Sequence, residues 1–337
     1  MKVVASAPGK LVVSGEYAVL AGAPALALCI NRRVTCTLGD GTRAGWHFVA
    51  RGFAGESLHS RQQLVDGAAL VNDDPGYLCQ HVVKQLQGAI PPDTLPENLD
   101  IEIDSRAGFN AGQKLGIGTS AAVCVSVTAA LLRWCNSDLP AFPIAQRAHQ
   151  QSQGGRGSGV DVAAACSGGF IRYERGSDQR SPQTKRLAFP ARVAFATIWT
   201  GVGAATRDYL QRFDTWCAGT QPAPLRALID AANDVADAVP DAARFVRQLR
   251  AYAEALQHLD RAAQLGIYSN SHQRLAAIGT TSGVVYKPCG AGGGDFGMAF
   301  AQGAQAIESF AHAARAAGFV PLPLELDLHG ITVGIEG

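Results

Sequence analysis

Residues 108–122 read Gly108-Phe109-Asn110-Ala111-Gly112-Gln113-Lys114-Leu115-Gly116-Ile117-Gly118-Thr119-Ser120-Ala121-Ala122, a glycine-rich loop that leads directly into two hydroxyl residues and an apolar helical run. Glycines let the backbone approach a polyphosphate closely, and Thr119 or Ser120 can cap the helix that follows. The unpaired N–H groups at the start of a helix over 119–135 then point toward negative charge. The loop therefore predicts a phosphate-binding site, although the same residues also suit a tight turn with a helix cap.

Three further patterns add charged groups and a second glycine loop. Lys10 lies between an apparent strand and a turn, where its ammonium can reach a bound anion or simply end a strand at the surface. Asp161 stands at the start of an otherwise apolar helix of small residues. It can balance the helix dipole, or act as a carboxylate beside a lysine that accepts a proton or orients a substrate hydroxyl. A second glycine-dense loop covers 287–297, between short apolar strands.

Composition limits the possible partners. The chain has 337 residues, enough for two domains that each bury a core. Its 29 basic and 28 acidic residues leave no excess charge that would attract nucleic acid or a membrane surface. No segment reaches the roughly 18 apolar residues of a membrane span, and the first residues lead into a strand pattern, so we expect a cytoplasmic protein.

Cysteine and histidine spacing gives no sign of a protein-built metal site. The eight cysteines form no Cys-x-x-Cys pair and fall largely in apolar runs, so we expect reduced thiols in the core. The eight histidines, His149 and His272 among them, lack metal-ligand spacing and are expected in solvated or core roles. Any metal is expected to arrive with a nucleotide.

Hydrophobic periodicity predicts mixed α+β structure in both halves of the chain. A polar stretch over 174–191 predicts an exposed connection, which places two domains at 1–180 and 181–337. We expect the second half to pack its helices on one face of a small sheet. In the first half, strands are predicted at 3–8, 33–39, 44–50 and 98–104, and helices at 76–88, 119–135 and 141–151. In the second half, strands are predicted at 193–199, 283–287, 296–301 and 331–335, and helices at 206–218, 222–238, 241–258, 260–277 and 304–317.

Two familiar nucleotide motifs match in form but not in context. Residues 116–121 fit Gly-x-Gly-x-x-Ala and residues 292–297 fit Gly-x-Gly-x-x-Gly. A dinucleotide fingerprint requires a buried strand directly before the first glycine, whereas 107–115 is a polar loop. Neither glycine run continues into the Gly-Lys-Ser or Gly-Lys-Thr of a Walker loop. The phosphate site is therefore of another kind.

The three glycine-rich patches occur in the order typical of one superfamily. Pro8-Gly9-Lys10 with Gly15-Glu16, then Gly116–Ala121, then Gly290–Asp295 resemble the motifs of the GHMP kinases, and the resemblance spans nearly the whole chain. It implies an α+β two-domain GHMP kinase fold: an N-terminal domain like ribosomal protein S5 domain 2 and a ferredoxin-like C-terminal domain, with ATP and acceptor in the cleft between them. Thr119 stands where the superfamily usually has serine, which keeps the hydroxyl and adds a methyl group.

Within this superfamily the chain resembles the phosphomevalonate kinases in the segments 148–149, 157–163 and 199–201. Tyr17 replaces the histidine typical of galactokinases, and Gln150 occupies the position of the magnesium-binding glutamate of mevalonate kinases. The resemblance implies ATP-dependent phosphorylation of 5-phosphomevalonate to 5-diphosphomevalonate on the mevalonate route to isoprenoids. A mevalonate kinase, a related small-molecule kinase or decarboxylase, and a catalytically inactive nucleotide-binding homologue remain alternatives.

The resemblance also implies roles for individual residues, with ATP, Mg²⁺ and a small acceptor as the only ligands. Lys10 is expected to bridge the acceptor oxygen and the γ-phosphoryl group, while Asp161 orients Lys10 or takes a residual proton. Ser120 is expected to contact the magnesium ion that accompanies ATP. The residues expected to bind ATP are Lys114, Gly116, Ile117, Gly118, Thr119, Ser120 and Ala121; those expected around the acceptor are Ser14, Tyr17, Arg156, Ser158, Gly159, Arg207, Gly292 and Gly293, with Lys114 as a further candidate cation there.

Overall fold

A computed structural model describes residues 1–53, 55–67, 70–91, 94–155, 157–177, 180–203 and 206–336. The chain forms two compact units that alternate along the sequence. The first unit comprises Met1–Lys10, Cys29–Gly169 and Asp327–Gly337, and the second comprises Leu11–Leu28 and Phe170–Leu326. The division into domains at residue 180 stays a prediction, because the compact units are not continuous segments.

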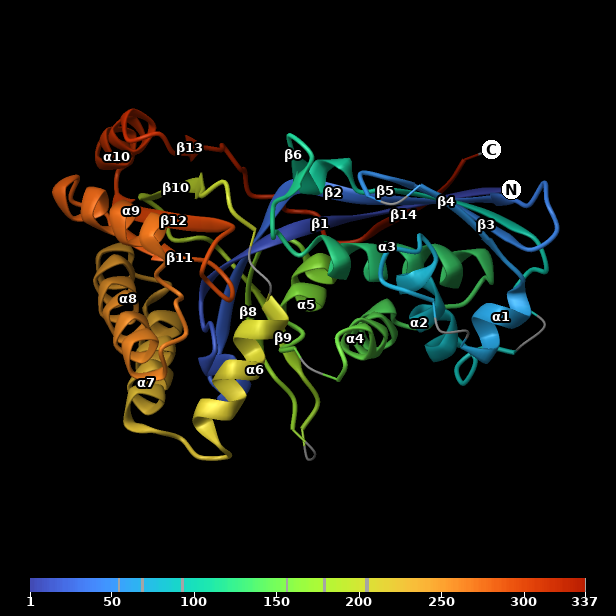
Figure 1. The fold of residues 1–337 in the computed structure, drawn as a ribbon, viewed down its shortest axis with the longest axis horizontal. Coiled ribbons are helices and arrows are strands. Elements are labelled where there is room, and N and C mark those ends of the chain that lie inside the picture. The colour runs from blue at the N-terminus through green and yellow to red at the C-terminus, as the bar shows by residue number, and fades with distance from the viewer. Residues whose placement is uncertain are drawn as a thin grey trace. The chain divides into compact units, whose positions relative to one another are not determined.

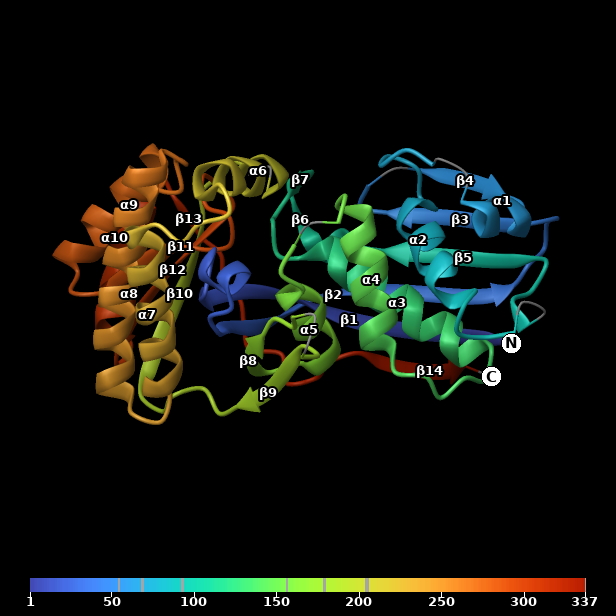
Figure 2. The ribbon, with the colours of Figure 1, turned by 90° about the horizontal axis from the view of Figure 1, so that it is seen from below.

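The first unit is a sheet whose strands follow the order β14-β1-β2-β5-β3-β4. Strands β3 and β5 pair in parallel, whereas β2 and β5 are antiparallel. Figure 1 shows helices α2, α3 and α4 together on one face of this sheet, and Figure 2 shows the same face from below. The strands are β1 (Lys2–Ser14), β2 (Ala25–Asp40), β3 (Trp46–Arg51), β4 (Glu56–His59), β5 (Leu99–Asp104) and β14 (Thr332–Glu336), with a hairpin of β6 (Phe109–Asn110) and β7 (Gln113–Lys114); the helices are α1 (Arg61–Asp66), α2 (Tyr77–Leu86), α3 (Thr119–Trp134), α4 (Ala141–Ser152) and α5 (Val160–Ser167).

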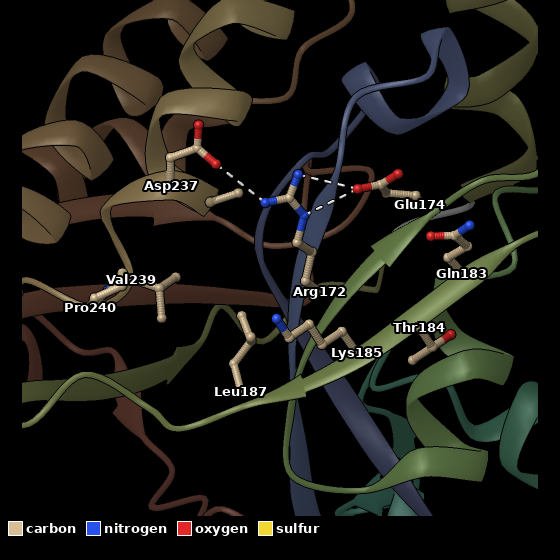
Figure 3. A pocket seen from close by; sticks show the side chains of 10 residues that line it. Arg172, Glu174, Gln183, Thr184, Lys185, Leu187, Asp237, Val239 and Pro240 are labelled. Atoms are coloured by element: carbon tan, nitrogen blue, oxygen red, sulfur yellow. Dashed lines mark hydrogen bonds and ion pairs between the residues drawn. The ribbon is translucent and has the colours of Figure 1, made fainter.

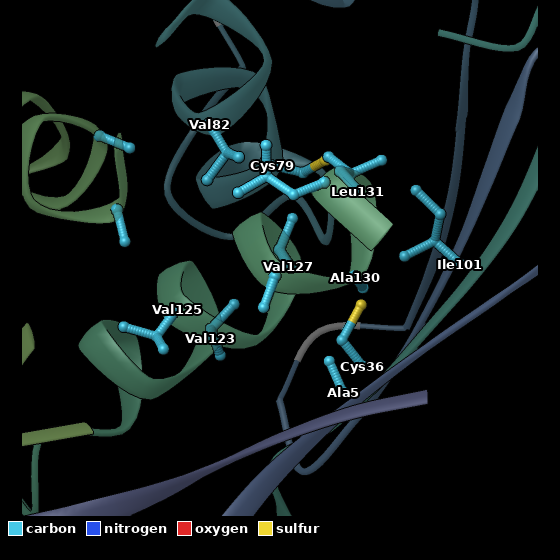
Figure 4. Packing of buried hydrophobic residues seen from close by; sticks show 14 of the residues in the cluster. Ala5, Cys36, Cys79, Val82, Ile101, Val123, Val125, Val127, Ala130 and Leu131 are labelled. Carbon is cyan, nitrogen blue, oxygen red and sulfur yellow. The ribbon is translucent and has the colours of Figure 1, made fainter. Parts of the chain in front are cut away.

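Helix α3 forms the centre of the first unit's core. Its sequence is dominated by small and β-branched residues, and it is buried on nearly every side. Figure 4 shows Val123, Val127 and Leu131 of α3 among side chains of α2 and of the sheet, such as Val82 and Cys36. A helix that is apolar all round needs neighbours on all sides. The core therefore holds α3, and with it the glycine loop before it, in one position.

The strand predicted over 331–335 exists. It is β14, and it pairs antiparallel with β1, from Lys2↔Glu336 to Ser6↔Thr332. The strand itself is therefore confirmed, although it was grouped with the strands of the second half and lies in the sheet of the first unit. A local pattern of alternating residues predicts a strand, whereas its partner depends on where the rest of the chain lies.

The second unit contains a four-stranded sheet in the order β11-β12-β10-β13, covered by helices. A separate core of Ile198, Leu275 and Phe310 with their neighbours lies between sheet and helices. Two strands outside this sheet, β8 and β9, pair with each other, and β8 also pairs with Ala25–Leu28 of β2. The strands are β8 (Phe170–Glu174), β9 (Gln183–Leu187), β10 (Val193–Trp199), β11 (Val285–Pro288), β12 (Phe296–Gln302) and β13 (Val320–Pro321); the helices are α6 (Thr206–Cys217), α7 (Ala223–Ala238), α8 (Ala242–Ala263), α9 (Asn270–Thr281) and α10 (Ala304–Ala316).

Two local predictions in this half were wrong. The helix expected over 260–277 is interrupted: α8 ends at Ala263, Gln264 has a left-handed backbone, and α9 begins only at Asn270. The Asp260 carboxylate accepts the N–H groups of Gly266, Ile267 and Tyr268 and so stabilises the turn. The polar stretch over 174–191, expected as a connection, contains strand β9, because an exposed edge strand carries polar residues just as a loop does.

None of the eight cysteines, all of which the structure describes, is in a disulfide; six are buried, and Cys135 and Cys166 are partly exposed. Among the helices that the structure describes, none combines the length and apolarity required to span a bilayer.

Candidate active site

The glycine loop lies against β1 in the first unit. Gly116 and Gly118 have left-handed backbones (φ 71° and 78°), and the carbonyl of Ile117 between them accepts the N–H of Lys10 at 2.8 Å. Helix α3 begins at Thr119, and the N-cap residue is Gly118, with no side chain bonded to the first-turn N–H groups. The expectation that Thr119 or Ser120 caps this helix was wrong. The helix N-terminus thus keeps its donors and its positive dipole end for an anion.

The two hydroxyl residues after the loop have different surroundings. Thr119 is buried, and its Oγ1 has no hydrogen-bond partner among the described residues. A Cβ on Gly108 would lie 2.5 Å from that oxygen and 2.9 Å from the Thr119 methyl group. Gly108 therefore makes the room that the threonine needs. Ser120 instead hydrogen-bonds to His149, with 3.1 Å between Oγ and Nε2.

Lys10, Gly118 and Asp161 meet at this helix start. A Cβ built on Gly118 would lie 3.2 Å from Cε of Lys10 and 3.6 Å from Cβ of Asp161. Asp161 lies in the first turn of α5 and accepts the N–H of Val162 at 3.0 Å. Burial acts to raise the pKa of Asp161, but the charges of His149 and Lys10 and the backbone N–H groups lower it below its usual value. Asp161 is therefore a carboxylate at neutral pH and a weak base.

His149 is a site residue that sequence reasoning missed. It comes from α4 and is 3% exposed. Its Nε2 lies 3.3 Å from Nε2 of Gln153, and its Nδ1 lies 3.9 Å from Oδ2 of Asp161. Burial lowers the pKa of His149, the charges of Lys10 and Lys114 lower it further, and Asp161 opposes them. The sequence holds no spacing signal for this group, because three separate helices supply Ser120, His149 and Asp161.

Several other predicted residues of the first unit have clear positions. Lys114 is exposed on β7, and its charge reaches His149. Ser158 accepts the N–H of Val160, and Gly159 takes a left-handed backbone directly before α5. Arg156 lies outside the described residues.

The second unit holds another set of predicted residues around Glu16. The Glu16 carboxylate accepts Nζ of Lys287 at 2.5 Å and the hydroxyl of Tyr252 at 2.7 Å. Lys287 is completely buried and also donates to the carbonyl of Val12. This buried pair joins the turn after β1 to the strand that leads into the second glycine loop. Sequence reasoning assigned no role to Lys287, because its partner lies 271 residues away.

Tyr17, Ser14 and Arg207, three further predicted residues of the second unit, have different surroundings. Tyr17 has a left-handed backbone, its hydroxyl donates to the carbonyl of Ala291 at 2.6 Å, and its ring packs on Phe213. Burial raises the pKa of the Tyr17 phenol, which stays protonated. Ser14 is fully buried, with no partner for Oγ among the described residues. Arg207 is exposed at the start of α6.

Gly292 and Gly293, also predicted as site residues, both have left-handed backbones in the second glycine loop. The N–H of Gly293 donates to the carbonyl of Ile267 at 2.8 Å. The predicted residues thus form two groups. The first unit brings together Lys10, the loop 116–121 and Asp161, and the second unit brings Tyr17 to the loop 290–294.

An open cavity of about 610 Å³ lies elsewhere in the second unit, between β8, β9 and the end of α7 (Figure 3). Arg172 lines it and forms ion pairs with Glu174 and Asp237, at 3.2 and 3.3 Å. The opposite charges in its lining balance, and none of the predicted site residues lines it.

Comparisons with known proteins agree with the motif assignment. Residues 77–169 match the family described as GHMP kinases N terminal domain. A phosphomevalonate kinase of Streptomyces sp. (strain CL190) is 28% identical, over 98% of this chain and 98% of the relative. A mevalonate kinase of Thermococcus onnurineus is 24% identical, over 99% and 98% of the two chains.

Among solved structures, a Streptococcus pneumoniae phosphomevalonate kinase in complex with phosphomevalonate and AMPPNP is similar, with a TM-score of 0.80. The similarity covers 96% of this chain and 99% of the other, at 19% identity, and at that identity it shows the fold alone. The α+β fold class predicted from the resemblance is confirmed.

Proposed function

We propose that this chain, a member of the GHMP kinase superfamily, transfers the γ-phosphoryl group of ATP to the phosphate of 5-phosphomevalonate, giving 5-diphosphomevalonate and ADP. The observation that carries the proposal is the convergence of Lys10 and Asp161 on Gly118, at a helix N-terminus without a side-chain cap. This arrangement offers backbone donors to a polyphosphate, with a cation and a fixed anion beside it. The step belongs to the mevalonate route to isoprenoids.

The acceptor's chemistry suits these residues. The second pKa of a phosphate monoester is about 6, so the attacking oxygen is already anionic near neutral pH and requires no strong base. Asp161, whose pKa is lowered, fits the task of orienting Lys10 better than that of removing a proton. Lys10 then neutralises charge between the acceptor oxygen and the γ-phosphoryl group.

A magnesium ion that accompanies ATP fits the residues present. Among the described residues no cluster of three His, Cys, Asp or Glu side chains could hold a metal by itself. The Ser120 hydroxyl, half-buried at the start of α3, is an oxygen ligand of the kind that Mg²⁺ takes alongside nucleotide phosphates. Bound there, the ion would supply charge neutralisation on the transferred group.

Phosphomevalonate is favoured over mevalonate by one position on α4. Gln150, which stands where mevalonate kinases typically carry a magnesium-binding glutamate, donates its amide to the carbonyl of Gly155 at 3.2 Å. A neutral amide cannot act as a base, and it lacks the negative charge with which a carboxylate holds a divalent cation. Mevalonate remains the second candidate acceptor, because the mevalonate kinase relative also covers the whole chain.

The deciding experiment measures ADP release from Mg²⁺-ATP with mevalonate, 5-phosphomevalonate, 5-diphosphomevalonate and galactose offered in parallel, followed by product mass. We expect turnover on 5-phosphomevalonate alone, with a mass gain of one phosphoryl group. Turnover on a different acceptor alone would overturn the substrate assignment. ATP binding with no transfer to any acceptor would instead favour an inactive nucleotide-binding homologue.

A further inference from the structure

We propose that His149 is a positioning residue for the phosphate-binding loop, which accepts the hydroxyl proton of Ser120 and leaves the Ser120 oxygen free to contact a divalent cation. The inference rests on the proposed use of ATP and goes beyond it, because it assigns a role to a residue outside the three glycine-rich patches. It concerns the direction of one hydrogen bond, which the neighbours of His149 determine.

The direction follows from the neighbours of His149 on both sides. Gln153 places its amide nitrogen, which can only donate, 3.3 Å from Nε2 of His149. Nε2 is therefore the unprotonated nitrogen of a neutral imidazole, and the ring proton sits on Nδ1. Nδ1 faces the Asp161 carboxylate at 3.9 Å, which is consistent with a proton on that side.

This tautomer of His149 sets the direction of the Ser120 hydroxyl proton. Two donors then share the lone pair of Nε2, the Gln153 amide at 3.3 Å and the Ser120 hydroxyl at 3.1 Å, so the single hydroxyl proton of Ser120 points to His149. The remaining directions around Oγ carry lone pairs, so Ser120 cannot donate to a phosphate oxygen while this bond is made. Lone pairs suit a hard cation, and this geometry favours a metal contact over a phosphate contact.

The surroundings of His149 hold this arrangement in place. His149 is buried between α3, α4 and α5, and the charges that face it are Asp161 on α5, Lys10 on β1 and Lys114 on β7. Helix α2 also packs on α4. Burial and the charge of Lys84 lower the pKa of His81 on this helix. The groups proposed to receive and orient the nucleotide are therefore connected through the imidazole ring of His149.

The test measures how tightly Mn²⁺, a spectroscopic substitute for Mg²⁺, binds to the protein with AMPPNP, by electron paramagnetic resonance. Loss of an outer partner of a metal ligand typically costs 10–100-fold in metal affinity, so His149→Phe should weaken Mn²⁺ binding by about that factor, and Ser120→Ala, which removes the ligand itself, by at least as much. The double variant should bind no more weakly than Ser120→Ala alone, because His149 acts through Ser120. Additive losses in the double variant would overturn the proposal.

Two matched variants separate this role from simple packing. His149→Gln keeps an acceptor near the place of Nε2 and should restore most of the Mn²⁺ affinity. His81→Phe changes a histidine of the same unit whose Nε2 has no partner among the described residues, and should leave the affinity unchanged. Equal losses in His149→Gln and His149→Phe would assign His149 to packing alone.

The tautomer of His149 can be measured directly in the unmodified protein. With ¹⁵N-labelled histidine, long-range ¹H–¹⁵N correlation should show His149 as the Nδ1–H form at neutral pH, assigned by its loss in His149→Gln. The Nε2–H form would overturn the proposal. If the Mn²⁺ and tautomer results hold while no acceptor is phosphorylated, the proposed function fails alone; if 5-phosphomevalonate is phosphorylated and the losses are additive, the role of His149 fails alone.

Discussion

Lys287 and Glu16 form a buried ion pair, in which the lysine is completely inaccessible to solvent. Removing one partner leaves an uncompensated buried charge, which typically costs 3–5 kcal/mol. We expect Lys287→Met to lower the free energy of unfolding by about this amount, with a smaller loss when Glu16→Gln is added. Urea unfolding measures these changes in the free energy of unfolding. The exposed pair of Lys2 and Glu336 is the control, because Lys2→Met should cost no more than about 1 kcal/mol. Equal losses in the two lysine variants would contradict a special stabilising role for the buried pair.

Lys10 is the residue on which the proposed chemistry depends most. Lys10→Met keeps the aliphatic stem beside Gly118 and removes the charge, so we expect kcat to fall by at least about 10²–10³-fold with an unchanged thermal unfolding temperature. Lys84→Met, on the exposed face of α2, should leave kcat unchanged. Near-normal turnover of Lys10→Met would remove Lys10 from the mechanism.

At the scale of the element, the start of α3 depends on a left-handed glycine. Alanine costs about 1–2 kcal/mol in this conformation. Gly118 and Gly112 both have φ 78°, but a Cβ at Gly118 would press on the Lys10 side chain whereas one at Gly112 meets open space. We therefore expect similar stability losses for Gly118→Ala and Gly112→Ala, with a loss of kcat/KM of about tenfold or more only for Gly118→Ala. Equal losses of kcat/KM would show that backbone strain alone decides activity.

For the whole molecule, His272 links stability to pH. The ring is fully buried, accepts the Tyr286 hydroxyl on Nδ1 at 2.7 Å and donates from Nε2 to the carbonyl of Gly294 at 3.0 Å. Burial lowers the pKa of His272 to about 4. Because the folded pKa lies below the unfolded one, this contribution is complete above about pH 6.5 and is lost as the pH falls toward 4.

Between about pH 7 and pH 5, the free energy of unfolding should therefore fall by about 2 kcal/mol more in the wild type than in His272→Gln. Urea unfolding at the two pH values measures the difference. The same pH dependence in both proteins would show that His272 titrates normally in the folded chain.

Most elements were predictable from the sequence because their causes are local. The 3.6-residue period of α2 and the apolar runs of β10 and β12 depend on residues close along the chain, and these elements are confirmed. The prediction over 260–277 failed at a turn whose stabilising group, Asp260, looks like an ordinary helical residue until the backbone curls back on it. The strand over 331–335 was found, but its partner β1 was not.

The sequence by itself determined where the glycine loop begins, that a helix follows it, and that Lys10 and Asp161 are candidate site residues, because glycine spacing and helical patterns are local properties. Only the tertiary structure decided that His149 stands between Ser120 and Asp161 and that Glu16 neutralises Lys287. These contacts join residues from 12 to 271 positions apart, so only the packing of whole helices and strands brings them together.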